Sequence, residues 1–375
     1  MDAIVVGGGI AGSSAAYHLA DAGVGTRLID RADSGRATDA GAGILAPATS
    51  SRTASDEWFR FAVEAVDHYR DLDADLRAVV DDTGFAERPL LKVAVDGDDA
   101  PAFDRALERV RNRADRLGAP DTDRVTELDA SAARDRFPPL ADVARTVLYD
   151  GAAQVDGRRF AAALRTAGER AGLAVETASV ERIRVADGRV AGVTTADGRR
   201  RDADAVVVAG GAWSGAFADD LDAPLPVEPM RGQLVHLDAD ADTADWPILS
   251  TMGHCYMVPW PGGRVVSGAT YEEGSGFVPY PDVRGMRTVL ERTERVAPGL
   301  AEAAFREVRV GLRPATPDGL PVVGGVPGVE GAYVATGFGP TGLTMGPYCG
   351  KVVAELVRGE APSTDPSAFS VERFR

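Results

Sequence analysis

The chain has 375 residues, of which 45% are hydrophobic and 26% charged, and its formal net charge is −16 at pH 7. That length exceeds one ordinary hydrophobic core, so two domains are expected, and the composition is that of a globular rather than a disordered protein. The negative charge argues against a nucleic-acid partner or an anionic membrane surface, because both bind through a basic face.

The acidity has an unusual make-up. Aspartate outnumbers glutamate about two to one, and Lys92 and Lys351 are the only lysines. This balance favours a halophilic source, because high salt screens the repulsion between surface carboxylates. Codon usage in a GC-rich genome accounts for part of it.

Neither the cysteines nor the apolar runs indicate a metal site or a membrane span. Cys255 and Cys349 fit no metal-ligand spacing and no disulfide framework, so two free thiols are expected. No apolar run approaches the roughly 18 residues of a transmembrane segment. A first strand starting near Asp2 leaves no room for a signal peptide, and we expect a cytoplasmic protein.

The first thirty residues carry a dinucleotide-binding pattern. A strand is expected over 4–6, a helix over 10–22 and a second strand over 26–29, which ends in Asp30. Gly7, Gly9 and Gly12 stand between the first strand and the helix. In this arrangement the first glycine allows a tight turn, the second admits a pyrophosphate, and the third lets helix and strand pack closely.

The neighbouring positions complete that pattern. The helix start offers unpaired N–H groups to phosphates. Asp30 can accept hydrogen bonds from a ribose diol and would repel a 2′-phosphate. The motif by itself leaves NAD and FAD open.

The middle of the chain alternates helical and extended patterns. Small residues fill 38–47, which suits backbone lying against a flat ligand, and an apolar face with helical spacing covers 55–82. A strand over 90–95 and a helix over 102–117 follow. Further strands are expected over 174–177, 180–185, 190–195 and 205–208, then in a second, antiparallel sheet over 233–237, 256–258, 265–269 and 305–310.

The C-terminal part repeats the glycine-rich arrangement of the N-terminus. Strands at 322–323 and 332–335 precede the glycine-rich loop 336–342 and a helix over 343–357. Two such units suit a long ligand held at both ends, which favours FAD over NAD. The expected fold is therefore α/β, with a discontinuous Rossmann-like FAD-binding domain (1–85, 151–220 and 320–375). An antiparallel-sheet substrate-binding domain with helices takes residues 86–150 and 221–319.

Arg313 stands in the stretch GLRPATPDGLPVVGG, which runs from Gly311 to Gly325. The stretch is interpreted as a rigid turn, because Pro314 and Pro317 each have a fixed φ. Such bracing suits a side chain that must point one way. The alternative is a structural ion pair with Asp318 or a neighbouring acid.

With these segments the chain resembles the D-amino acid oxidase superfamily of flavoproteins, most closely glycine oxidases and D-amino acid dehydrogenases. The resemblance covers nearly the whole length and is weakest over 86–150. It rests on the segments Thr38–Leu45, Gly211–Gly215, His254–Pro259, Gly311–Pro314 and Gly339–Met345.

The resemblance implies roles for individual residues. Arg313 and the Tyr256 hydroxyl would bind a substrate carboxylate, a task that suits the bidentate guanidinium, and His254 lies near the site. The implied cofactor-binding residues are Gly7, Gly9, Ile10, Ala11, Gly12, Asp30, Arg31, Thr38, Ala42, Gly43, Ile44, Val180, Gly210, Trp213, Gly339, Thr341, Gly342, Leu343 and Thr344.

Two departures separate the chain from the sarcosine oxidases of that superfamily. Gly311 stands where those enzymes link the flavin to a cysteine, so FAD should be non-covalent. Thr344 stands where they have a lysine, and with only Lys92 and Lys351 in the chain no oxygen-activating lysine is expected beside the flavin.

The implied activity is oxidative deamination of glycine or a small D-amino acid. Hydride transfer to flavin N5 would give an imino acid, which water hydrolyses to a 2-oxo acid and ammonia, and oxygen or a quinone would reoxidise the flavin. Alternatives are an FAD-containing electron-transfer subunit, a sarcosine- or D-proline-type secondary amine dehydrogenase, and an NAD-linked dehydrogenase. The amino acid used, the acceptor and formation of a homo-oligomer are left open.

Overall fold

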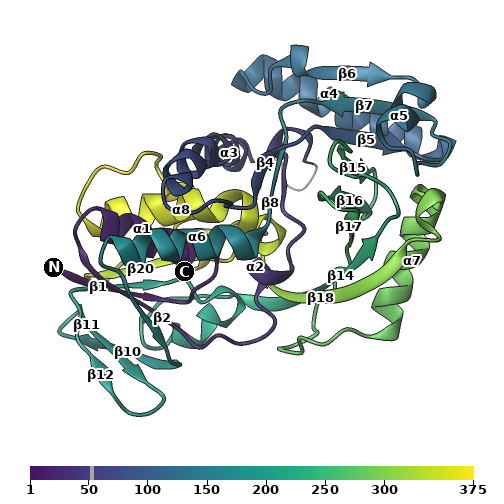
Figure 1. Cartoon of the computed structure of the whole chain (residues 1–375). Helices are drawn as coiled ribbons and strands as arrows, with labels where there is room; N and C mark the ends of the chain where they lie inside the picture. The colour runs from purple at the N-terminus through teal and green to yellow at the C-terminus, as the bar shows by residue number, and fades with distance from the viewer. Residues whose placement is uncertain (51–54) are drawn as a thin grey trace.

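The protein is described by a computed structural model that covers residues 1–50 and 55–375. Two large sheets stand side by side, joined by a small three-stranded sheet of β3 (Ile44–Leu45), β8 (Ala153–Val155) and β4 (Phe85–Glu87) (Figure 1). The mixture of a parallel and a mostly antiparallel sheet confirms the predicted α/β fold class.

The first sheet has six strands in the order β19-β20-β13-β1-β2-β9. Five are parallel, and β19 (Val322–Gly325) pairs antiparallel at one edge. The parallel strands are β1 (Asp2–Val6), β2 (Gly25–Asp30), β9 (Ala174–Thr177), β13 (Ala205–Val208) and β20 (Ala332–Thr336). β1 lies in the middle of the sheet, with β2 on one side and β13 on the other. At a position where the strand order changes direction in this way, a crevice for ligands forms at the carboxyl ends of the strands.

Apolar layers cover both faces of this sheet. On one face pack α1 (Ile10–Asp21), α3 (Asp56–Arg77), α6 (Gly157–Arg170) and α8 (Gly342–Val357). Buried residues of α1, α3 and α8 cluster with β1 and β13, and those of α6 form a second cluster with α1 and α3. The other face is covered by the sheet of β10 (Val180–Ala186), β11 (Arg189–Thr195) and β12 (Arg200–Arg201). The helix predicted over 10–22 and the strand ending in Asp30 are confirmed.

The second sheet has eight strands in the order β18-β14-β17-β16-β15-β5-β7-β6. Their bounds are β5 (Leu90–Ala94), β6 (Val125–Leu128), β7 (Arg145–Tyr149), β14 (Glu228–Asp238), β15 (Ile248–Thr251), β16 (Tyr256–Pro259), β17 (Arg264–Gly268) and β18 (Ala304–Ala315). Strands from 86–150 and from 221–319 thus share one sheet, although the domain division itself stays a prediction.

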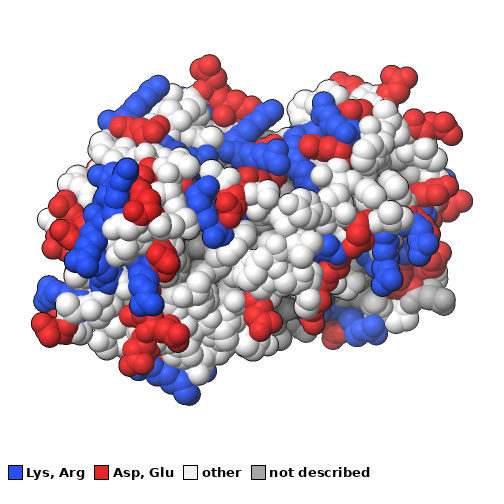
Figure 2. Space-filling model, turned by 90° about the horizontal axis from the view of Figure 1, so that it is seen from below, with Lys and Arg blue, Asp and Glu red and all other residues white. Residues whose placement is uncertain are grey.

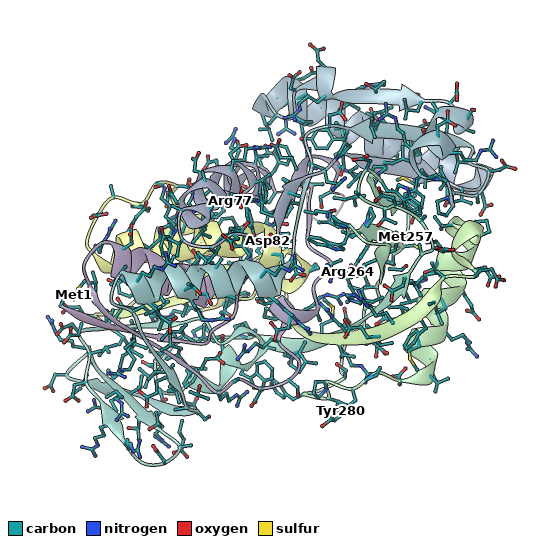
Figure 3. The ribbon with its side chains drawn as sticks, viewed as in Figure 1. Met1, Arg77, Asp82, Met257, Arg264 and Tyr280 are labelled. Carbon is teal, nitrogen blue, oxygen red and sulfur yellow. The ribbon has the colours of Figure 1, made fainter. Side chains whose placement is uncertain are left out.

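Alternation along the strands gives this sheet two different faces. Met257 packs with Leu249 and Val93 on the face covered by α5 (Ala130–Arg136) and α7 (Val283–Val296), and it is labelled in Figure 3. Its neighbour Tyr256 faces the other way, toward the first sheet. The helix α4 (Ala100–Leu117) also lies on that inner face, through Phe103.

Arg313 lies on a strand rather than in a turn, which corrects the sequence interpretation. It pairs with Met230 near the end of β18, and the turn begins only at Thr316. The proline-rich composition misled the prediction, since Pro314 sits opposite Pro229, at the strand end. Asp318, one candidate partner for an ion pair with Arg313, pairs instead with Arg373, whose Nε lies 2.7 Å from its carboxylate.

On the surface, positive and negative side chains are interspersed over the face shown in Figure 2. Exposed apolar side chains gather between β17 and α7, where Tyr280 is 68% exposed and stands at the lower edge of Figure 3. None of the helices in the described part of the chain combines the length and apolar character needed to cross a bilayer.

Two partly buried histidines, each with a buried Nε2 atom, make the packing of the helices sensitive to acid. His18 of α1 and His68 of α3 have ring centroids 5.6 Å apart, and Nε2 of each finds no hydrogen-bond partner among the described residues. Burial lowers the pKa of His18 to about 3 and that of His68 to about 4. The folded state therefore binds fewer protons than the unfolded chain below the ordinary histidine pKa near 6.5.

Stability is thus expected to fall as the pH drops from about 6.5 toward 4, at up to about 1.4 kcal/mol per pH unit for each ring. Melting temperatures of wild type and His68→Gln between pH 7 and 5 test this. The variant should show a shallower decline. Equal slopes for wild type and His68→Gln would refute the assignment.

Candidate functional site

One large cavity of about 600 Å³ opens between the two sheets. Its lining comes from the β1–α1 loop, β2, β10 and the start of α8 on one side, and from β5, β15, β16, β14 and β18 on the other. Every residue that the sequence analysis assigned to the site lines this cavity except Gly12.

The glycines of the first loop are fixed by close backbone packing. Gly7 has φ +108°, and a Cβ there would lie 2.4 Å from the carbonyl oxygen of Ala209. A Cβ on Gly12 would lie 1.9 Å from the carbonyl oxygen of Gly7, so a glycine is needed here for α1 to pack closely against the loop. Gly12 does not line the cavity. The amide of Ile10 donates to Oγ1 of Thr38 at 2.9 Å, which ties the small-residue segment to the loop.

Asp30 holds the same loop from the end of β2. Its carboxylate accepts hydrogen bonds from the amides of Gly8 and Ala32, and it pairs with Arg36. Sequence reasoning missed Arg36, because nothing in the local pattern marks it. The acid is therefore anchored at the edge of the cavity where a ribose would reach it.

Aromatic and small residues continue this end of the cavity. The guanidinium of Arg31 lies 4.8 Å from the ring centroid of Trp213, and that ring stacks on Phe277 at 5.5 Å. Val180 and Gly210 also line this region.

The middle of the cavity has a floor of backbone. Gly43 has φ +84°, and a Cβ there would lie 1.8 Å from the carbonyl oxygen of Val155, so only glycine fits. The hydroxyl of Thr344 lies 3.4 Å from the carbonyl oxygen of Ile44 and joins the start of α8 to this segment. The lining here also includes Ala42, Gly339, Thr341, Gly342 and Leu343.

Arg313 is held in place from three sides. It is 9% exposed, its Nη1 donates to the carbonyl oxygen of Thr270 at 2.9 Å, and its guanidinium lies 4.4 Å from the ring centroid of Tyr271. A Cβ on Gly232 would come within 2.4 Å of Cζ and both Nη atoms. The guanidinium therefore rests on bare backbone of β14.

A network of charged side chains supports the carbonyl that Arg313 contacts. The hydroxyl of Thr270 lies 2.6 Å from Glu272, which also accepts from Gln233 at 2.7 Å. Glu272 pairs in turn with Arg231. Burial acts against ionisation of Glu272, but these donors win and lower its pKa.

The hydroxyl of Tyr256 also lies over a glycine. A Cβ on Gly268 of β17 would come within 3.0 Å of that oxygen. Because β14 and β17 are neighbours, the Tyr256 hydroxyl and the Arg313 guanidinium lie over adjacent strands and face one cavity. Sequence reasoning missed Gly232 and Gly268, since neither belongs to a glycine-rich motif.

His254 and Lys92 both line the cavity. The His254 ring packs against Tyr271 at 4.9 Å, and the Tyr271 ring in turn lies against the Arg313 guanidinium. Lys92, which the sequence analysis did not assign to the site, lines the cavity and is 8% exposed. Its distance from Arg313 in sequence hid this placement.

The cavity fits FAD in shape and in chemistry. The helices α1 and α8 both start at its wall, and the N-cap residue of neither provides a side-chain cap. Apart from the amide of Ile10, which donates to Thr38, the amides of their first turns can therefore serve an anionic or carbonyl oxygen. The lining extends from Asp30 and Trp213 to Tyr256, which suits a long ligand. Gly7, Gly9 and Asp30 would hold the nucleotide part, and Gly43 and Thr344 the ring.

Comparison with known proteins extends these observations. A family model described as FAD dependent oxidoreductase, DAO, matches residues 2–356. An uncharacterized oxidoreductase of Bacillus subtilis is 40% identical over 372 residues, which cover 98% of this chain and 97% of the relative. Glycine oxidase of Pseudomonas aeruginosa is 32% identical over 373 residues, with 98% and 97% covered. The crystal structure of iminodiacetate oxidase from Chelativorans has a TM-score of 0.92 and 35% identity, and 98% of each chain is covered.

Proposed function

Because this chain belongs to the DAO family of FAD-dependent oxidoreductases, as its motifs indicated, we propose that it oxidises the carbon–nitrogen bond of a small amino acid. The observation that carries the proposal is the buried, fixed guanidinium of Arg313 facing the same cavity as the Tyr256 hydroxyl. A primary amine such as glycine or a small D-amino acid would yield the 2-oxo acid and ammonia. Similarity to glycine oxidases supports this choice.

Arg313 acts by positioning in this proposal. A guanidinium binds a carboxylate through two parallel hydrogen bonds, and its partial burial strengthens that pairing. Since the contacts with Thr270 and Tyr271 fix the guanidinium before substrate arrives, little conformational freedom is lost on binding. The Tyr256 hydroxyl would donate a further hydrogen bond to the same carboxylate.

FAD, when bound, supplies the two-electron acceptor for this oxidation. The residues of the chain hold the amino acid so that its Cα–H bond faces the floor formed by Gly43 and its neighbours. No carboxylate lines the side of the cavity formed by the second, eight-stranded sheet (the sheet side) among the described residues. The proposed oxidation requires no protein base if the amine binds uncharged.

A secondary amine is the second candidate substrate. The similarity to iminodiacetate oxidase favours it, since that enzyme is named for a secondary amine. The same guanidinium would hold one carboxylate of such a substrate, and hydrolysis of the oxidised product would release a primary amine.

Anaerobic mixing of the FAD-loaded protein with single amines tests the proposal. Glycine, D-alanine, sarcosine, D-proline and iminodiacetate should include at least one that bleaches the flavin band near about 450 nm. Peroxide formed on adding air would distinguish an oxidase from a dehydrogenase. Bleaching by none of a broad panel of D-, L- and N-substituted amino acids would instead favour an electron-transfer subunit.

A further inference from the structure

The charges around the cavity are divided unequally between its two ends. The acidic residues of the described lining are Asp30, Asp33 and Glu181, all on the nucleotide side. There the cations are paired, Arg36 with Asp30 and Arg31 with Asp33 at 2.8 Å. The sheet side is lined by Arg313, Lys92, Arg105 and Arg109, and no acidic residue lies beside them in the described part of the lining. In a chain of net charge −16, this end is a local concentration of positive charge.

Lys92 and Tyr256 belong to one row across the second sheet. Lys92 pairs with Ser250, Ser250 with Tyr256, and Tyr256 with Gly268, which pairs with Leu234. Residues paired in this way point to the same face. Four strand spacings of about 4.8 Å separate β5 from β14, which places their backbones about 19 Å apart. The distance between the charged groups is shorter, because the side chains at both ends extend into the cavity between these strands.

The helix α4 adds the two arginines to the Lys92 end. Phe103 and Leu107 pack with Ala94 and Val147, on the face of the sheet that carries Lys92. Arg105 and Arg109 are one turn apart on this helix, and both line the cavity. The lysine and these arginines therefore form a second positive site, opposite Arg313 and with Tyr256 between them.

We propose that Lys92, Arg105 and Arg109 bind a second carboxylate, so that the substrate is a dicarboxylic amine whose other carboxylate is held by Arg313. This inference rests on the proposed function and specifies its substrate class. A glycine zwitterion carries one carboxylate and can contact one positive site only. A dicarboxylic amine is anionic overall, and a positively lined cavity raises its local concentration as well as its affinity.

Two matched pairs of compounds isolate the second carboxylate. The first pair is diglycolate and methoxyacetate, which differ by one carboxylate and cannot be oxidised in this way because they lack an amine. The second pair is iminodiacetate and sarcosine, candidate substrates that also differ by one carboxylate. Binding of the first pair to the FAD-loaded protein is measured by perturbation of the flavin spectrum. Diglycolate should bind about 10- to 100-fold more tightly than methoxyacetate, the size expected for hydrogen bonds to a charged group.

Variants locate the effect. Lys92→Gln and Arg109→Gln should each reduce the preference for diglycolate at least severalfold, while methoxyacetate binds as in wild type. Arg111→Gln is the matched control, because Arg111 lies on the same helix, 63% exposed and 3.5 Å from Glu127. Arg313→Met should weaken both compounds. The ratio of kcat/KM for iminodiacetate to that for sarcosine should likewise fall in Lys92→Gln and Arg109→Gln and stay at the wild-type value in Arg111→Gln.

Equal binding of diglycolate and methoxyacetate, or a preference that survives in the Lys92→Gln, Arg109→Gln double variant, would overturn the inference. If glycine or sarcosine still bleached the flavin in that case, the proposed function would stand without it. If no amine bleached the flavin and neither acid bound, both would fail together.

Discussion

Arg313→Met is expected to lower kcat/KM for every carboxylate-bearing amine by roughly 30- to 5,000-fold, equivalent to about 2–5 kcal/mol. The loss should appear mainly in KM, because the guanidinium binds a part of the substrate that does not react. FAD should remain bound, since Arg313 belongs to the sheet side of the cavity. Arg313→Lys should recover only part of the activity, because an ammonium cannot form two parallel hydrogen bonds to a carboxylate.

Gly232→Ala tests the same geometry without removing the charge. Its methyl carbon would lie 2.4 Å from the guanidinium carbon, so the guanidinium must move off β14. The variant should reproduce a large share of the Arg313→Met defect while circular dichroism and FAD content stay normal. Unchanged KM in both variants would mean that the substrate carboxylate is bound elsewhere.

Asp30→Ala is expected to lose FAD, with affinity reduced about 10- to 100-fold for each charged hydrogen bond removed. The carboxylate accepts from the amides of Gly8 and Ala32, so its removal loosens the loop in addition to losing the proposed ribose contact. The flavin content after gel filtration, read as absorbance near about 450 nm relative to protein, measures the effect.

The matched control for Asp30 is Asp21→Ala, at an exposed aspartate at the end of α1. It should retain the cofactor. Because Asp30 also pairs with Arg36, thermal unfolding of the cofactor-free proteins must be compared, and it should differ far less than FAD content does. A fully loaded Asp30→Ala protein would contradict the proposed ribose contact.

Part of the candidate site could be predicted because its signals are short. The sequence Gly7-x-Gly9-x-x-Gly12 sits between a strand and a helix, and Asp30 follows at the end of the next strand. Within about thirty residues, local geometry fixes where these groups lie. The glycine-rich start of α8 is a signal of the same kind.

Other residues carry no such local signal. Lys92, Arg109, Gly232 and Tyr271 reach the cavity through strand pairings and packing that join distant parts of the chain. Lys92, for example, pairs with Ser250. Periodicity in the sequence predicts that a strand exists, but it does not say which strand lies beside it. The mistaken turn at Arg313 has the same origin, since only pairing with Met230 reveals the strand.

By itself, the sequence determined the α/β class and the dinucleotide loop, and it singled out the arginine that is proposed to bind a carboxylate, because each depends on a contiguous motif. The tertiary structure alone decided that this arginine rests on Gly232, and that a lysine and two arginines face it across the sheet. The reason is physical: register and burial are set by the whole core, and they bring together charges that are more than 200 residues apart in the chain.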